Sequence, residues 1–309
     1  MPKQLLMDHD GGIDDLLSLL LVLTMPDIQL TGVSVTPADC YLEPALESSY
    51  KLLQLMDQES VPLGRGDYNG INAFPSEWRA RPEIINALPL LINLPQSPDP
   101  YSYTSAPDLI INQLSSATDK VTILLTGPCS NLVLALEKEP ELKEKIEEIV
   151  WMAGALRVGG NVQTFQHDGS AEWNVFWDPI SAQKLVSYEL PLLMIPLDVT
   201  NHVPVTKKFL SALATQIDYK LSNLTGQLWA LTLDTIPSYH YTYFMWDILA
   251  TSYLAIPEQF TIETVKVKVS TRPPNAGQTY LDETGYVVRI ATDVNVSYFY
   301  EYLLAQFKR

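Results

Sequence analysis

The stretch Gln4-Leu-Leu-Met-Asp8-His9-Asp10-Gly11-Gly12-Ile13-Asp14-Asp15 places four carboxylates between two apolar segments. Residues 4–7 form an apolar run with the length of an interior strand, and the leucine-rich residues 16–23 form one long enough for a buried helix. The acids therefore lie where a strand passes into a helix. In an open parallel sheet this junction is at the carboxyl edge, where ligands bind, so the stretch predicts a binding site.

The density of acids in this stretch predicts a bound cation. A single Asp here would be expected to cap the helix, where its charge complements the helix dipole. Four acids within eight residues, flanked by apolar sequence, repel one another unless a proton or a cation lies between them. A divalent cation is the compensator that this arrangement favours. The stretch is not an EF-hand loop, because Ile13 and Leu19 occupy the positions that require glycine and glutamate.

The composition of the chain limits its partners. The formal net charge is −16, so nucleic acid and anionic membranes would be repelled, whereas small neutral or cationic ligands are compatible. The apolar run 16–25 is too short to span a membrane, and acids precede it, unlike in a signal peptide. Cys40 and Cys129 have neither a metal-ligand spacing nor a disulfide framework, so we expect free thiols. These features predict a cytoplasmic protein that binds a small molecule.

Strand and helix patterns alternate along the chain, which predicts an α/β fold with a mostly parallel central sheet flanked by helices. Strands are expected at 4–7, 28–36, 61–64, 121–126, 149–154 and 191–197, antiparallel strands at 261–270 and 285–292, and helices from 13, at 43–56, across 205–245 and at 294–307. Residues 65–105 are rich in Pro, Asn and Ser, and a long irregular segment of this kind is more often functional than idle. No internal repeat divides the sequence, so we predict a single domain, 1–309, with a Rossmann-like core.

Five short motifs, in this order and spacing, resemble the nucleoside hydrolase family. They are the acidic stretch, Leu125-Thr126-Gly127-Pro128-x-Ser130-Asn131, Met152-x-Gly154, Ala171-Glu172-x-Asn174 and Trp246-Asp247. Each motif is weak alone, but together they cover nearly the whole chain. The resemblance, closest to the purine-preferring (inosine-adenosine-guanosine) branch, implies Ca²⁺-dependent hydrolysis of the N-glycosidic bond of ribonucleosides to free base and ribose. It also implies a homo-oligomer, a dimer or a tetramer, that acts in purine salvage.

The matching positions imply a calcium site at the carboxyl edge of the sheet. Its ligands would be the carboxylates of Asp10, Asp15 and Asp247 and the main-chain carbonyl of Thr126, all of them oxygen donors, as a hard cation requires. The 2′- and 3′-hydroxyls of the ribose and a water would complete the shell. Asp10 would be the general base that takes a proton from this water.

Further matching positions imply contacts with the sugar. The residues that the resemblance assigns to it are Asp14 and Asn174 for ribose hydroxyls, Asn161 and Glu172 for the 5′-hydroxyl, and Met152. Asn161 follows two glycines and by itself would be interpreted as a turn residue. Only its match together with Glu172 and Asn174 gives it a role.

The base site is where the branches of the family differ. Trp78 and Trp246 match the two tryptophans that enclose the base in the purine-preferring branch, and Asp39 matches an acid that contacts it. Without this match, a tryptophan in a loop is equally well explained as a cover for the core. Gly12 departs from the branch, which has asparagine there. His240 could approach the leaving base, although an exposed loop histidine is the simpler interpretation.

Two other functions are compatible with the residues. Asp8-His9-Asp10-Gly11 also resembles the opening of the haloacid dehalogenase-like phosphatases, in which Asp8 would be the nucleophile and Mg²⁺ the cofactor. That interpretation leaves Asp14 and Asp15 without a role. A protein that binds nucleosides without cleaving them would keep the metal site, and release of the purine base from inosine distinguishes an enzyme from it.

Overall fold

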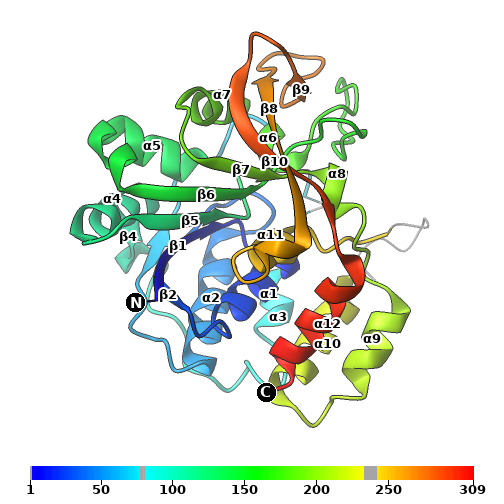
Figure 1. The fold of residues 1–309 in the computed structure, drawn as a ribbon. Coiled ribbons are helices and arrows are strands. Elements are labelled where there is room, and N and C mark those ends of the chain that lie inside the picture. Colours follow the sequence, from blue (N-terminus) through cyan, green and yellow to red (C-terminus); the bar gives the residue numbers. More distant parts are fainter. Residues whose placement is uncertain (1, 77–78, 80, 233–241) are drawn as a thin grey trace.

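Ten strands form one sheet in the described part of the protein, which is residues 2–76, 79, 81–232 and 242–309 of a computed structural model (Figure 1). In chain order they are β1 (Lys3–His9), β2 (Ile28–Val35), β3 (Leu63–Arg65), β4 (Thr104–Ser105), β5 (Val121–Leu125), β6 (Ile146–Met152), β7 (Leu192–Ile195), β8 (Phe260–Val269), β9 (Thr279–Leu281) and β10 (Tyr286–Val294). Their order across the sheet is β4-β3-β2-β1-β5-β6-β7-β10-β8-β9. Pairing is parallel from β4 to β10 and antiparallel among β10, β8 and β9, which confirms the predicted mostly parallel sheet.

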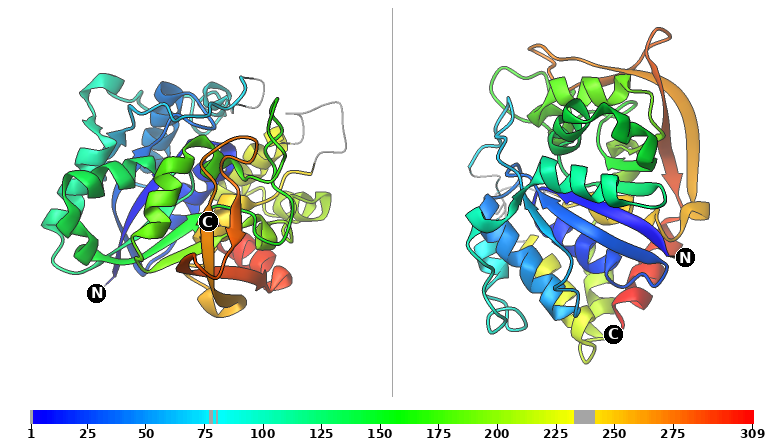
Figure 2. Two further views of the ribbon diagram at one scale, coloured as in Figure 1. Left: turned by 90° about the horizontal axis from the view of Figure 1, so that it is seen from above. Right: turned by 90° about the vertical axis from the view of Figure 1, so that its left-hand side faces the viewer.

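Helices cover both faces of this sheet. The α-helices are α1 (Ile13–Val22), α2 (Leu42–Leu55), α3 (Pro82–Ile85), α4 (Ala106–Ser116), α5 (Ser130–Lys138), α6 (Trp173–Trp177), α7 (Pro179–Ser187), α8 (Leu197–Thr200), α9 (Lys207–Ala214), α10 (Lys220–Thr232), α11 (Trp246–Ser252) and α12 (Val296–Phe307), and the 3-10 helices are η1 (Pro100–Ser102), η2 (Pro140–Lys145) and η3 (Pro257–Gln259). One face packs against α1, α2 and α9 to α12, and the other against α4, α5 and α7 (Figure 1, Figure 2). Within the described residues, no helix has the length and apolar character needed to cross a bilayer.

The central strands are apolar on both sides because both faces of the sheet are covered. Leu5 and Met7 of β1 belong to the core under α1 and α2, whereas Leu6 belongs to the core under α4 and α5. Strands buried in this way read as continuous apolar runs rather than as an alternation. The apolar run at the start of the chain therefore predicted the central strand of the sheet correctly.

The segment 205–245 departs from the predicted continuous helical region. The helix α10 ends at Thr232, and residues 242–245 are not helical. Phe244 instead forms an antiparallel bridge with Pro204. The neighbouring Tyr243 ring packs edge-on against Trp229 of α10, with 5.9 Å between ring centroids. Packing of this aromatic segment outweighs its helix pattern, and the segment leads directly into α11.

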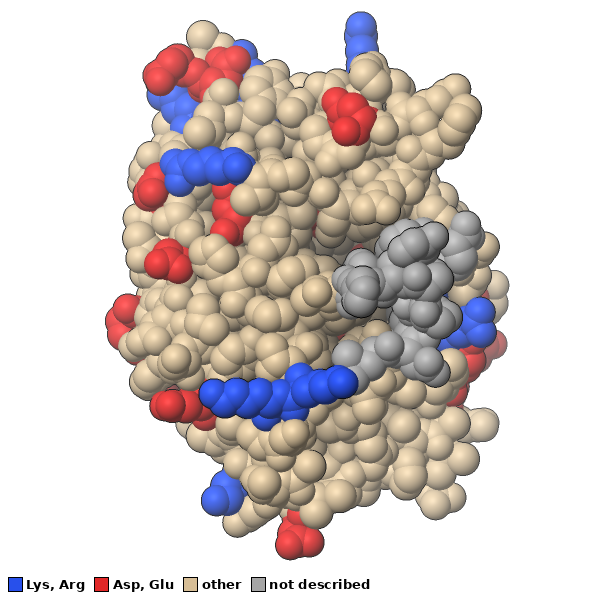
Figure 3. Space-filling model, turned by 90° about the vertical axis from the view of Figure 1, so that its right-hand side faces the viewer, with Lys and Arg blue, Asp and Glu red and all other residues tan. Residues whose placement is uncertain are grey.

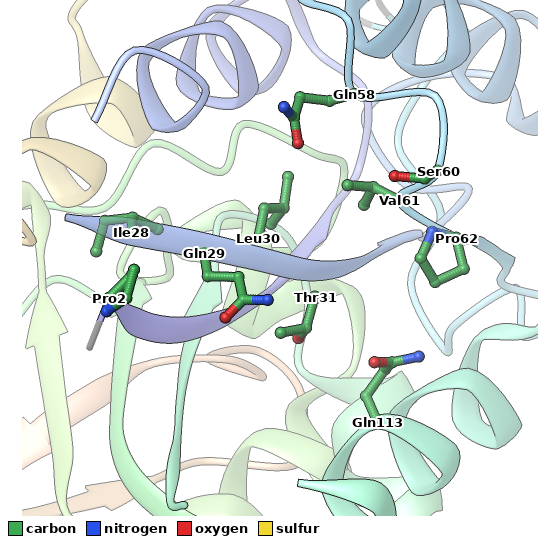
Figure 4. Close-up of a pocket in the computed structure, with 10 residues that line it drawn as sticks. All are labelled: Pro2, Ile28, Gln29, Leu30, Thr31, Gln58, Ser60, Val61, Pro62 and Gln113. Atoms are coloured by element: carbon green, nitrogen blue, oxygen red, sulfur yellow. The ribbon is translucent and has the colours of Figure 1, made fainter. Parts of the chain in front are cut away.

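A cavity of about 480 Å³ lies at the amino edge of the sheet (Figure 4). It is lined by the first residues of β2, by the segment that leads into β3, and by Gln58 and Gln113. The acidic stretch follows the carboxyl end of β1, so this cavity lies at the opposite edge from the predicted site.

Candidate active site

Three neighbouring strands end together at the predicted site. In the register of the sheet, Asp8 of β1 lies beside Leu125 of β5, and Leu125 lies beside Trp151 of β6. The residues that follow, among them Thr126 and Met152, therefore emerge at the carboxyl edge together with the acidic stretch. The face of the molecule on this side is mostly uncharged, with scattered Lys, Arg, Asp and Glu side chains (Figure 3).

Gly11 allows the chain to turn between β1 and α1. Its φ is +80°, in the left-handed region that favours glycine, and a Cβ there would lie 2.3 Å from Cys40 Sγ and 2.6 Å from Ala45 Cβ. The Cys40 thiol donates to the carbonyl of Asp10 at 2.7 Å. The turn is therefore packed directly against the start of α2. Cys40 and Cys129 are both buried and free, as predicted.

Three of the predicted calcium ligands are linked by hydrogen bonds around the acidic stretch. Asp10 Oδ2 accepts from the backbone N–H of Asp39 at 3.2 Å. Asp15 Oδ1 accepts from the Thr126 hydroxyl at 2.6 Å, and Asp15 Oδ2 accepts from the Gly12 N–H at 2.9 Å. Asp10, Asp15 and Thr126 are all buried.

Asp14 joins the acidic stretch to the last third of the chain. Its Oδ2 accepts from the backbone N–H of Asp247 at 2.7 Å, and its Oδ1 from that of Ile248 at 3.4 Å. Both donors lie in the first turn of α11, so the Asp14 carboxylate caps that helix and complements its dipole. Asp247, the remaining predicted ligand, is buried and held beside the acidic stretch in this way.

The carboxylates at this edge raise one another's pKa. Burial is the largest cause for Asp10, Asp14, Asp39 and Asp247, whose pKa values lie well above the usual range, and the negative charge of Asp15 raises all four further. Burial also raises the pKa of Asp15, while its hydrogen bonds lower it. Repulsion of this kind is relieved by protons or by a positive charge.

Asn174 ties together the ends of β5 and β6. Its Nδ2 donates to the carbonyls of Thr126 and Met152, at 3.0 Å each, and lies 3.5 Å from the Met152 sulfur. Because these contacts use the N–H groups of the amide, Asn174 Oδ1 is the atom that can accept from a substrate hydroxyl.

Glu172 and Asn161 are bound mainly to backbone groups. The Glu172 carboxylate accepts from two N–H groups in the first turn of α6, at 2.8 and 3.3 Å, and from the Gly154 N–H at 3.0 Å. Burial raises the pKa of Glu172 to about 7 despite these donors. Asn161 Oδ1 accepts from the Trp173 N–H at 3.2 Å.

Trp246 is the one of the two predicted base-stacking tryptophans that the structure describes. Its ring is half-buried and packs edge-on against Tyr243, with 4.6 Å between ring centroids. Its indole N–H is buried and finds no acceptor among the described residues. Trp78 and His240 lie outside the described residues, so their roles stay predictions.

The donor chemistry of the acidic cluster fits a hard cation. Asp10, Asp15 and Asp247 offer carboxylate oxygens and Thr126 offers a carbonyl, with no soft ligand in the set. In the part of the chain that the structure describes, no three Asp, Glu, His or Cys side chains converge as a preformed metal centre. The carboxylates of Asp14 and Asp15 instead accept from N–H and O–H donors. Their mutual repulsion is what a cation would relieve.

Comparison with known proteins identifies the family. Residues 5–301 match the family described as inosine-uridine preferring nucleoside hydrolase. The chain belongs to this family. The crystal structure of an inosine-uridine preferring nucleoside hydrolase from Bacillus anthracis is 34% identical, is covered over 99% of both chains and has a TM-score of 0.91.

More distant relatives of this nucleoside hydrolase include pyrimidine-specific enzymes. The pyrimidine-specific ribonucleoside hydrolase RihA of Klebsiella pneumoniae is 27% identical over 251 residues, which are 78% of this chain and 73% of the relative. An uncharacterised protein of Schizosaccharomyces pombe is 28% identical over 209 residues, 66% of this chain. The match spans 64% of the length of that yeast relative.

Two residues near the site of this nucleoside hydrolase were not singled out from the sequence. The Arg79 guanidinium lies 5.2 Å from the centroid of the Tyr41 ring, and its charge lowers the pKa of Asp39, which burial raises. No local pattern marks Arg79, which lies in an irregular loop. Trp173 stacks on Phe74 with 4.3 Å between ring centroids. The sequence could have indicated Trp173, because it lies between the predicted substrate-binding residues Glu172 and Asn174.

Asp8 is not placed to act as the nucleophile of a phosphatase. It is 1% exposed, and its Oδ1 accepts from Asn131 Nδ2 at 3.1 Å and from the Thr36 hydroxyl at 3.4 Å. Burial raises the pKa of Asp8 to about 7. The Asp8 carboxylate is thus held by other side chains, and the family match over residues 5–301 makes the phosphatase interpretation wrong.

Proposed function

We propose that this protein is an enzyme that cleaves the N-glycosidic bond of purine ribonucleosides to free base and ribose, with Ca²⁺ as its cofactor. The observation that carries the proposal is the cluster of mutually repelling carboxylates that separate parts of the chain bring to one sheet edge. Asp10, Asp14 and Asp15 come from the first turn after β1, and Asp247 comes from α11. Such an arrangement is unfavourable for folding, so it points to function.

Under this proposal Asp10, Asp15, Asp247 and the Thr126 carbonyl hold the ion, since Ca²⁺ takes about six to eight oxygen ligands. When bound, the ion supplies positive charge that keeps these carboxylates ionised, and it orients a water and the ribose diol. The four protein ligands are fewer than the ion requires, so coordination positions remain for the water and the ribose hydroxyls.

The side chains of the protein perform the remaining steps. Asp10 takes the proton from the attacking water, and its carboxylate is oriented by the Asp39 N–H. Asn174 Oδ1 accepts from a ribose hydroxyl, since its Nδ2 is already bound by two carbonyls. The ribosyl centre becomes positively charged in an oxocarbenium-like transition state, and the surrounding carboxylates stabilise that charge.

The proposal is tested by incubating the Ca²⁺-loaded protein with inosine, adenosine, guanosine, uridine and cytidine and measuring the reducing sugar released. We expect ribose from at least the purine nucleosides. Tight nucleoside binding without any release of base would support the non-catalytic binding protein instead.

Trp246 motivates a prediction about the base. Stacking on an aromatic face is worth about 1–3 kcal/mol per base, and a purine offers the larger face, so kcat/KM for inosine should exceed that for uridine by a part of this energy, roughly 5- to 10-fold. Trp246→Leu should remove most of this preference, and Trp246→Phe, which keeps an aromatic face, should retain it. Equal kcat/KM for inosine and uridine in the wild type would remove the purine preference from the proposal, and a higher value for uridine would indicate the preference of the pyrimidine-specific relatives.

The close approach of Gly127 to Asp10 motivates a prediction about the position of Asp10, the proposed general base. A Cβ at Gly127 would lie 2.9 Å from Asp10 Cβ and 3.0 Å from the Asp10 N, so Gly127→Ala must displace Asp10. We expect kcat to fall roughly 10²-fold, as a displacement of about 1 Å can cause. Gly159→Ala is the matched control, since nothing lies within 4 Å of a Cβ there. Similar kcat values for the two variants would show that Asp10 does not need its present position.

A further inference from the structure

The buried ring of His9 connects the acidic stretch to α2. His9 Nδ1 accepts from the backbone N–H of Gly11 at 3.1 Å, and His9 Nε2 lies 3.0 Å from the hydroxyl of Ser49. The Ser49 hydroxyl in turn donates to the carbonyl of Ala45 at 2.8 Å. His9 and Ser49 are both 0% exposed, so water does not compete for these contacts.

These contacts fix which nitrogen of His9 carries the proton. A hydroxyl has one proton, and that of Ser49 is directed to Ala45. His9 Nε2 must therefore be the N–H that donates to Ser49 Oγ. His9 Nδ1 then has the lone pair that accepts from Gly11. Ser49 thus selects the tautomer that the turn requires.

The Gly11 N–H joins this series of hydrogen bonds to the turn that carries Asp10. Gly11 adopts the left-handed conformation that reverses the chain between Asp10 and α1. A buried N–H without an acceptor is costly, so the turn keeps this conformation most easily while Nδ1 faces it. The Asp10 carbonyl also accepts from the Cys40 thiol, at 2.7 Å. The carboxylate of Asp10 is therefore fixed through its own backbone.

We propose that His9 is a positioning residue, in which the Nδ1 atom, oriented by Ser49 on α2, holds the Gly11 turn and thereby places the Asp10 carboxylate for cation binding and proton removal. The role of Asp10 in this statement rests on the proposed function. The hydrogen-bond chain from α2 to Gly11 does not, and it is measured separately.

Two amide variants separate the two nitrogens of the ring. In His9→Asn the side-chain oxygen lies where Nδ1 was and still accepts from Gly11, but it does not reach Ser49. In His9→Gln the terminal amide lies near the Nε2 position and still reaches Ser49, but it leaves the Gly11 N–H without an acceptor. Both variants lose the ring and its packing, and they differ in which of the two hydrogen bonds remains.

The experiment compares kcat, KM, the Kd for Ca²⁺ by titration calorimetry and the thermal midpoint of both variants. We expect His9→Asn to keep kcat within roughly tenfold of the wild type and His9→Gln to lose roughly 10²-fold, with a matching rise in the Kd for Ca²⁺. The thermal midpoint should be the lower of the two in His9→Gln, because its Gly11 N–H is buried without an acceptor. Equal losses of kcat in the two variants, or a larger loss in His9→Asn, would show that the ring only fills space.

Nitrogen NMR of histidine-labelled protein tests the hydrogen-bond chain without any enzymatic assay. The chain has 4 histidines, so the His9 signals can be assigned from the His9→Asn spectrum. We expect a protonated Nε2 and an unprotonated Nδ1, and loss of this single tautomer in Ser49→Ala. Protonation at Nδ1 in the wild type would overturn the proposal. Absence of nucleoside hydrolysis by the wild type would contradict the proposed function but not this tautomer.

Discussion

Replacing Asp10 by asparagine is expected to lower kcat by at least about 10⁴-fold, because one substitution removes both the general base and a charged cation ligand. Loss of a general base alone costs about 10²- to 10⁴-fold. Asparagine keeps the shape of the side chain, and its Oδ1 can still accept from the Asp39 N–H that now binds Asp10. Substrate binding should weaken far less than turnover, since Asn174 and Trp246 are untouched.

The control for this substitution is Asp27→Asn, which removes one negative charge at an exposed position. It should leave kcat within the error of the assay. Steady-state kinetics of both variants with inosine, together with inosine binding by calorimetry, measures the two effects. An Asp10→Asn enzyme with more than a few per cent of the wild-type kcat would remove Asp10 from the role of base.

Removal of the cation is expected to abolish activity and to destabilise the protein at neutral pH. Binding of a ligand to the folded state alone stabilises it by about 4 kcal/mol at a thousand times its Kd. Dialysis against a chelator should therefore lower the thermal midpoint, and added Ca²⁺ should restore both midpoint and activity. Full activity in protein shown by elemental analysis to be free of metal would contradict the cofactor assignment.

The pH dependence of the metal-free protein has a definite sign. The acids of the cluster bind their protons more tightly in the folded state, because burial and repulsion raise their pKa. Their stabilising contribution is fully present below the ordinary value of 3.8 and is lost as pH rises through the folded value, which is about 7 for Asp8. Without Ca²⁺, the thermal midpoint should decrease as the pH is raised from 5 to 8. Saturating Ca²⁺ should reduce this fall, because it favours the ionised acids.

The local sequence was sufficient to predict those structural features that residues close together in the chain form. The run from Gln4 to Asp15 predicted strand, turn and helix because the acids, the glycines and the apolar residues act within a few positions of one another. Antiparallel strands were expected at 261–270 and 285–292, and β8 and β10 do pair in this way, although the short strand β9 lies between them in the chain. That β10 also pairs with β7 depends on how a long intervening segment packs, which no local pattern records.

In the candidate site, too, local sequence predicted some features, and contacts between distant residues determined others. Asp14 was expected to contact the substrate, and the structure shows that it also caps α11, a contact between residues 233 positions apart. Glu172 was expected to bind the 5′-hydroxyl, and it caps α6. The capping role of Glu172 could have been predicted from the sequence, since Glu172 directly precedes a helix. The contact of Ser49 with His9 had no such signal, because a serine within a helix usually bonds to its own backbone.

The cap that Asp14 forms on α11 has a consequence for the order in which the protein assembles during synthesis. Chains are made from the amino terminus at about 5–20 residues per second, so the 233 positions between Asp14 and Asp247 correspond to roughly 10–50 seconds. Throughout that interval the first strand and helix have left the ribosome while Asp14 has no helix end to accept from. The two hydrogen bonds that join Asp14 to α11 can therefore form only after α11 has emerged. The last quarter of the chain, rather than the motif that begins it, determines when the nascent protein closes its site.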